Sequence, residues 1–323
     1  MALPEALQGK LSVPVIGAPM FLVSFPPLVA AQCKAGIVGA FPHVNARPAE
    51  QFDRWLTEIQ ADLAAWDAAH PENPSAPYAV NLIVHKTNPR YLPDLEVVVA
   101  HKVPVVITAL GNPARVVEAV HGYGGLVLCD VINAAHARKA IAVGVDGIIA
   151  VGAGAGGHAG TQSPLSLARE IRAFWGGIFV LGGAIGDGYQ VRAAEVLGAD
   201  LAYMGTRFIA TAESHAQDAY KQMLVDCGVE DLVYSDRFSG VHANFLKPSI
   251  ERHGIDIAAL PPKAPDVSSL AGSDAKAWKD IWSAGQGVAT IHDIPSVEEL
   301  VDRLRREYTL ACGLGPSLSL RRG

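Results

Sequence analysis

Short apolar runs rich in valine and isoleucine recur along the first two-thirds of the chain, separated by longer stretches of mixed polarity. Each run is nearly continuous in apolar residues rather than alternating, which is typical of strands buried on both faces. The sequence therefore predicts eight buried strands. They are Val13–Ala18, Ile37–Phe41, Tyr78–Ile83, Val103–Thr108, Gly125–Asp130, Val145–Val151, Ile178–Leu181 and Asp200–Met204.

The stretches between these runs have helical periodicity. The predicted helices are Pro27–Lys34, Ala49–Ala68, Leu92–His101, Pro113–His121, Ala134–Val143, Leu165–Phe174 and Gly188–Leu197. Alternating strands and helices indicate an α/β fold, and eight strands fit a (β/α)8 TIM barrel. A doubly wound open sheet is the alternative. We favour the barrel because small and polar residues follow many different strands, as they do around the mouth of a barrel.

The alternation stops after Ala210. Residues 213–280 contain helical pieces but no clear strand–helix pair, which predicts a small, mainly helical insert that caps the barrel after its eighth strand. The barrel then consists of residues 1–212 and 281–323. A helix over Ser296–Arg306, opened by the capping-box pair Ser296 and Glu299, is expected to pack back on the barrel.

Composition narrows the functional classes. The 323 residues are 50% hydrophobic and 18% charged with a net charge of -6, so no basic surface indicates a nucleic acid or an anionic membrane as partner. The first residues lack the pattern of a signal peptide, and no apolar run has the length of a membrane span. The four cysteines are scattered and predict free thiols in a reducing, cytoplasmic compartment. No histidine or carboxylate spacing predicts a metal site.

The stretch GVDGIIAVGAGAGGHAG, residues 144–160, is the most informative motif. A branched apolar strand runs into a glycine–alanine loop whose one ionisable side chain is His158. Glycines let backbone N–H groups approach a ligand closely, and an imidazole can transfer a proton or hydrogen-bond a flat ligand. We therefore expect a catalytic role for His158.

Other strand ends carry small or polar residues. The first strand is followed by Gly17-Ala18-Pro19-Met20, mostly small residues, so a flat ring can lie against the backbone there. Asn81 lies towards the end of the third strand and offers both a donor and an acceptor. Asp130 ends the fifth, where it either accepts a hydrogen bond from the ligand or caps the helix that begins at Ala134.

Two glycine-rich turns follow strands seven and eight, and each is expected to stand immediately before a helix. The first contains Gly182 and Gly183, and the second contains Gly205 and Thr206. Barrel enzymes commonly bind phosphate at these two turns, with N–H groups at helix N-termini. The pair predicts a phosphate site.

Six motifs together resemble the nitronate monooxygenase family, formerly called 2-nitropropane dioxygenases. They are VPVIGAPM, AVNLIV, AGGHAG, VLGGAIGDG, ADLAYMGTRFIAT and WSAGQG. The similarity extends from about Val13 to Leu304 and is weakest between Glu213 and Asp280. It implies an FMN-dependent TIM barrel with a helical substrate domain above the flavin.

The resemblance also implies roles for individual residues. His158 matches the catalytic histidine of the family, which accepts a proton from a nitroalkane or hydrogen-bonds a nitronate. The implied flavin contacts are Ala18, Pro19, Met20, Asn81, Asp130, Gly156, Gly157, Gly182, Gly183, Gly205, Thr206 and Gln286, with Ser283 as a further contact. The chain departs from some relatives at Cys129–Asp130, where they carry a lysine. A carboxylate there cannot stabilise negative charge on the reduced flavin as a cation does.

Three functions remain open at this point. The first is oxidation of alkyl nitronates, such as propionate 3-nitronate, by O2 to a carbonyl compound and nitrite. The second is an FMN-dependent NAD(P)H:quinone or enoyl reductase, which shares the fold and the cofactor. The third is a non-redox phosphate-binding barrel. The resemblance also makes a homodimer an expectation, because barrels of this type often pair through their helices.

Overall fold

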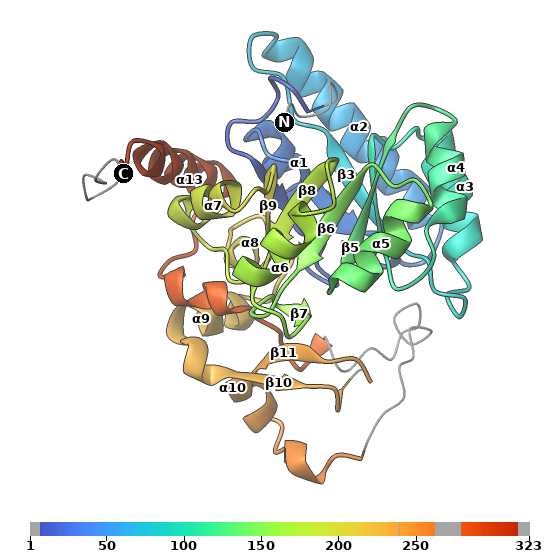
Figure 1. The fold of residues 1–323 in the computed structure, drawn as a ribbon. Coiled ribbons are helices and arrows are strands. Elements are labelled where there is room, and N and C mark those ends of the chain that lie inside the picture. The colour runs from blue at the N-terminus through green and yellow to red at the C-terminus, as the bar shows by residue number, and fades with distance from the viewer. Residues whose placement is uncertain (1–6, 239, 262–278, 316–323) are drawn as a thin grey trace, which may run out of the picture.

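A computed structural model describes residues 7–238, 240–261 and 279–315 of the chain. Its main feature is a parallel sheet of eight strands in the order β1-β9-β8-β6-β5-β4-β3-β2 (Figure 1). The strands are β1 (Val15–Gly17), β2 (Gly39–Pro42), β3 (Tyr78–Ile83), β4 (Val105–Ala109), β5 (Leu126–Val131), β6 (Gly147–Val151), β8 (Ile178–Gly182) and β9 (Leu201–Met204).

The two edge strands of this sheet meet each other. Ile16 of β1 forms a parallel bridge to Val38, just before β2. The Gly17 N–H donates to the Val38 carbonyl at 2.8 Å, and the Val38 N–H donates to the Val15 carbonyl at 3.1 Å. This closure confirms the predicted (β/α)8 barrel, and the alternative of an open doubly wound sheet is wrong.

Helices surround the barrel, and apolar side chains fill the space between them and the sheet. They are α1 (Pro26–Lys34), α2 (Gln51–Ala69), α3 (Tyr91–Ala100), α4 (Ala114–His121), α5 (Ala134–Ala142), α6 (Pro164–Arg172), α7 (Gly188–Val196), α8 (Thr206–Ile209) and α13 (Val297–Cys312). The predicted capping box of Ser296 and Glu299 opens α13, which packs against α7 and α1 and so completes the ring.

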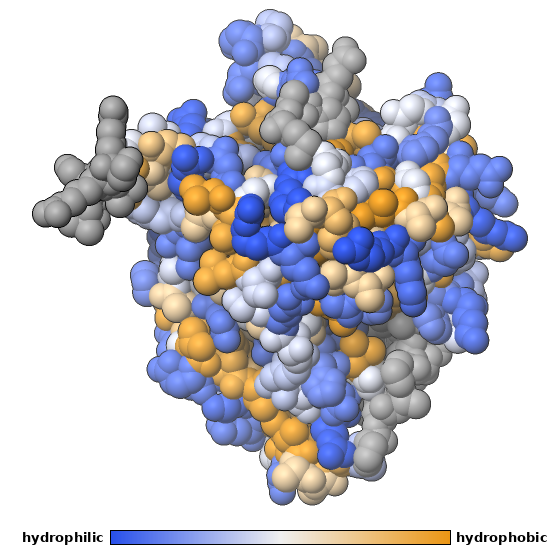
Figure 2. Space-filling view, in the orientation of Figure 1, coloured by the Kyte–Doolittle hydropathy of each residue, from blue (hydrophilic) through white to orange (hydrophobic). Residues whose placement is uncertain are grey.

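The surface carries hydrophilic and hydrophobic residues interspersed over both barrel and insert (Figure 2). Most large apolar side chains of the barrel strands are buried, whereas exposed ones such as Leu165 and Val196 occur singly on outer helices. Among the described residues, no helix is long and apolar enough to cross a membrane.

The insert after the barrel contains helices and also a small sheet that the sequence analysis did not predict. Its elements are α9 (Asp218–Asp226), β10 (Leu232–Ser235), β11 (Ala243–Leu246) and α10 (Lys247–Glu251). β11 pairs antiparallel with β10 on one side and on the other with β7 (Gly157–His158) from the glycine loop. Residues 262–278 of the predicted insert lie outside the described residues, and its boundaries at 213 and 280 stay a prediction.

Candidate functional site

The interior of the barrel ends in a ring of eight residues at the carboxyl ends of the strands. Inward-facing side chains alternate along a strand, so the residue two positions after a core residue points the same way. Leu128, Ile149 and Leu201 belong to the inner core, and Asp130, Val151 and Tyr203 follow them on the same faces. We call these eight residues the rim: Ala18, Pro42, Asn81, Ala109, Asp130, Val151, Gly182 and Tyr203.

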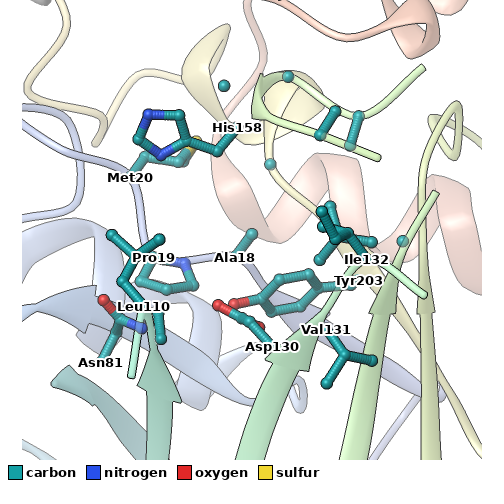
Figure 3. Close-up of a pocket in the computed structure, with 18 of the residues that line it drawn as sticks. Ala18, Pro19, Met20, Asn81, Leu110, Asp130, Val131, Ile132, His158 and Tyr203 are labelled. Atoms are coloured by element: carbon teal, nitrogen blue, oxygen red, sulfur yellow. The ribbon is translucent and has the colours of Figure 1, made fainter. Parts of the chain in front are cut away.

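The rim forms the floor of a cavity of about 930 Å³, a volume typical of cofactor and small-molecule sites. Five rim residues are small or apolar, and only Asn81, Asp130 and Tyr203 carry polar groups. Figure 3 shows these three side chains on one side of the cavity and His158 on the opposite side. The rim and His158 therefore bound the cavity from opposite sides.

His158 lies on the two-residue strand β7, whose position depends on the insert. His158 pairs with Ala243 and Gly157 with Asn244 of β11. The Gly157 N–H donates to Ser283 Oγ at 2.6 Å, and Asn244 Nδ2 donates to the Ala155 carbonyl at 2.7 Å. These contacts hold in place the loop that carries His158.

The electrostatic environment of His158 differs from that of a surface histidine. The side chain is largely buried, and burial lowers its pKa to about 4 because a low-dielectric surrounding disfavours the charged form. The imidazole is therefore neutral at pH 7. In this form one ring nitrogen carries a proton and the other can accept one.

The pKa of Asp130 is shifted in the opposite direction to that of His158. Burial raises the pKa of this carboxyl to about 7. The alternative in which Asp130 caps helix α5 is wrong. Asn133 is the cap, with its Oδ1 accepting a hydrogen bond from the His136 N–H at 2.8 Å. Asp130 instead faces the cavity.

Glycines line the end of the cavity where a phosphate was predicted. A Cβ on Gly156 would lie 2.8 Å from the Gly285 nitrogen and 3.0 Å from Thr206 Oγ1, and Gly183 has a φ of +120°. Larger side chains at these positions would clash or strain the backbone. Thr206 accepts a hydrogen bond from the Gly285 N–H at 2.9 Å, which leaves its hydroxyl proton available to a ligand.

Only one of the two predicted phosphate turns leads directly into a helix. Gly205 is the N-cap of α8, whereas α7 begins at Gly188, five residues beyond Gly183. Asp187 caps α7 by accepting from the Gln190 N–H at 2.8 Å. The expectation that the Gly182–Gly183 turn lies immediately before a helix is therefore wrong, and phosphate binding by N–H groups of α7 stays a prediction. A phosphate near Gly182 and Gly183 would contact the backbone of the loop.

The cavity brings together all predicted site residues except Gln286. Gln286 is exposed, and its side chain packs against Gly154 behind the glycine loop. Sequence reasoning missed Tyr203 and Leu110, which also line the cavity. Tyr203 could have been found, because it follows Leu201 by two positions and so points to the same inner face of the barrel. Among the residues that the structure describes, no cluster of histidine, cysteine or carboxylate side chains fits a metal.

Comparisons with known proteins agree with this architecture. A family model described as nitronate monooxygenase matches residues 5–307. A nitronate monooxygenase from Paraburkholderia phytofirmans is 31% identical, covering 91% of this chain and 92% of the relative, and one from Pseudomonas aeruginosa is 30% identical, covering 90% and 96%. A solved nitroalkane oxidase from Streptomyces ansochromogenes is 25% identical with a TM-score of 0.78, covering 95% and 99% of the two chains.

These relatives are named for redox reactions, so the third alternative, a non-redox phosphate-binding barrel, is wrong. The family model spans nearly the whole barrel and the insert, including the loop that carries His158. The chain is an oxidoreductase and belongs to the nitronate monooxygenase family.

Proposed function

We propose that the protein is an FMN-dependent nitronate monooxygenase that uses O2 to convert alkyl nitronates to carbonyl compounds and nitrite. The observation that carries this proposal is the placement of a neutral His158 across the cavity from the small and polar groups of the rim. Membership of the family supports it. A cytoplasmic location and a homodimer stay predictions.

The residues of the cavity fit FMN. The ring would lie on Ala18 and Pro19, with its polar edge towards Asn81 and Asp130. Asn81 Nδ2 donates to the Ile107 carbonyl at 3.3 Å, so its Oδ1 is left to accept from a ring N–H. The phosphate would bind between the two glycine turns near Thr206. When bound, FMN would supply the redox chemistry by taking an electron from the nitronate and passing it to O2.

His158 would act on the substrate. A neutral imidazole N–H can donate a hydrogen bond to the anionic nitro group of a nitronate. Accepting a proton from the carbon of a neutral nitroalkane is harder, because a base with a pKa near 4 binds that proton weakly. We therefore propose that nitronates are better substrates than the corresponding nitroalkanes.

The shape of the cavity keeps the reductase as a second candidate. Its lining extends past the rim to Asn112 after β4 and to His136 and Lys139 on α5. Basic side chains at this end fit a phosphorylated substrate such as a nicotinamide nucleotide. The reductase would use the same flavin site with NADH or NADPH as the electron donor.

An anaerobic titration separates the two candidates. Purified protein loaded with FMN receives propionate 3-nitronate in one cuvette and NADH, then NADPH, in another, while the flavin absorbance is followed. One-electron reduction by the nitronate, with no change from either nucleotide, supports the proposed function. Rapid bleaching by NADH or NADPH with no response to nitronate supports the reductase, and failure to bind FMN contradicts both.

A further inference from the structure

Two buried polar atoms of the rim have no hydrogen-bond partner among the described residues. They are Asp130 Oδ1 and the Tyr203 hydroxyl oxygen. Leaving a buried polar group unpaired costs about 1–3 kcal/mol, and native proteins rarely do so without a reason. Two such atoms in one cavity therefore indicate a bound molecule that pairs with both.

The two side chains approach each other from different strands. Asp130 is on β5 and Tyr203 on β9, and in Figure 3 the hydroxyl of Tyr203 points towards the carboxyl of Asp130. Burial, together with the nearby Asp130 charge, raises the pKa of Tyr203 well above its ordinary value, so this hydroxyl keeps its proton. The pair offers one permanent donor and one carboxyl that can either donate or accept.

This combination matches the pyrimidine edge of a flavin. That edge presents carbonyl oxygens and an N–H when the ring is oxidised, and it gains negative charge when the ring is reduced. A carboxylate next to that charge is repelled, whereas a protonated carboxyl donates a hydrogen bond to it.

We propose that Asp130 and Tyr203 together bind the polar edge of the flavin ring and that Asp130 takes up one proton when the flavin is reduced. The inference rests on the flavin site proposed above. The proton comes from solvent and converts a carboxylate to a carboxylic acid. The electrons come from the nitronate or a chemical reductant and do not change the oxidation state of Asp130.

The electrostatics of the cavity support this assignment. Burial places the pKa of Asp130 at about 7, so a modest added negative charge is enough to protonate it near neutral pH. Tyr203 on β9 and Cys129 on β5 keep their protons, since burial raises the pKa of both. His158 faces Asp130 across the cavity, and the other ionisable groups of the lining are Tyr220 on α9 and His136 and Lys139 on α5.

Counting protons tests the proposal. The midpoint potential of the FMN-loaded protein is measured against pH by reductive titration with a chemical reductant, and its slope gives the protons taken up per two electrons. At pH 8 we expect two protons for the wild type and one for Asp130→Asn. An Asp130→Asn protein with the wild-type slope would overturn the proposal.

Two further variants separate Asp130 from its neighbours. His158→Ala should still take up two protons on reduction. If His158→Ala takes up only one while Asp130→Asn takes up two, the second proton belongs to His158 and the proposal is overturned. Tyr203→Phe should also keep the second proton but should bind FMN about tenfold more weakly, because one hydrogen bond is lost. Unchanged FMN affinity in Tyr203→Phe would overturn the pairing.

A measurement on the wild type avoids dependence on how well the variants fold. Reduction-induced infrared difference spectra should show a protonated carboxyl group appearing at pH 8, and its absence would contradict the proposal. A protein that binds no FMN at all would instead contradict the proposed function. The exposed carboxylate Asp302 supplies a matched control, since Asp302→Asn should change neither slope nor affinity.

Discussion

The floor and the roof of the cavity are built in different ways. The floor is the rim, which continues the packed interior of eight parallel strands. The roof is β7, a strand of two residues held by β11 of the insert and by side chains such as Ser283. A floor supported by the barrel core suits binding and electrostatics. A roof that depends on a few hydrogen bonds suits a group whose exact position controls turnover.

The largest expected effect comes from removing the imidazole of the roof, for which we propose a catalytic role. His158→Ala should lower turnover of neutral nitroalkanes by about 100-fold, the lower end of the usual contribution of a group that transfers a proton, because a base with a pKa near 4 is weak. Turnover of preformed nitronates should fall less, and FMN binding should be unchanged because the floor is intact. O2 consumption with each substrate and flavin absorbance measure these effects.

The control for this prediction is His253→Ala, which removes an exposed histidine of the insert outside the cavity lining. It should keep full activity with both substrate classes. Unchanged nitroalkane turnover in His158→Ala would remove this residue from the base role.

The next prediction concerns the floor, where the ionisation of Asp130 makes the stability of the protein depend on pH. Burial raises the pKa of Asp130 from 3.8 to about 7. Its contribution to folding is therefore fully present below pH 4 and is lost as the pH rises through 7. In the flavin-free protein, Asp130→Asn should raise the free energy of unfolding by about 4 kcal/mol at pH 8 and by less than half of that at pH 5, at about 1.4 kcal/mol per unit of pKa shift.

Urea unfolding of wild type and variant at both pH values measures this difference, and subtraction cancels the titration of all other groups. A difference of the same size at pH 5 and pH 8 would show that the carboxyl charge is not its cause. Asp302→Asn again serves as the exposed control.

The same contrast explains which features the sequence predicts. Runs of apolar residues identify all eight barrel strands, because each strand is buried on both faces and its own residues are therefore nearly all apolar. Tyr203 was missed although its inward position follows from Leu201. The strands β10 and β11 were not predicted, because four residues each carry too weak a pattern and their partner β7 is a Gly-His pair. That pairing depends on tertiary contacts between segments about 85 residues apart.

The connection between insert and roof gives the next prediction. Ser283 Oγ accepts from the Gly157 N–H and donates to the Asn244 carbonyl, so it joins β7 to β11. Ser283→Ala should lower kcat for nitronates about tenfold, because the misplaced imidazole loses its alignment with the substrate. FMN affinity should stay within a factor of about three, and Ser283→Thr should restore most of the activity.

Loss of FMN binding rather than kcat in Ser283→Ala would assign Ser283 to the cofactor instead of to the position of His158. Steady-state kinetics with separate kcat and KM values, together with fluorescence titration of FMN, distinguish the two roles.

The smallest effect is expected at the outer edge of the roof. The Tyr234 hydroxyl on β10 donates to the Ala159 carbonyl, next to His158, at 2.8 Å, but this side chain is 38% exposed. Because water can replace the lost partner, Tyr234→Phe should cost only about 0.5–1 kcal/mol of stability and change the nitronate KM at most about threefold. A tenfold fall in kcat would mean that the second strand of the insert sheet positions His158 as strongly as Ser283 does. The roof would then be as rigid as the floor, and the contrast between them would not hold.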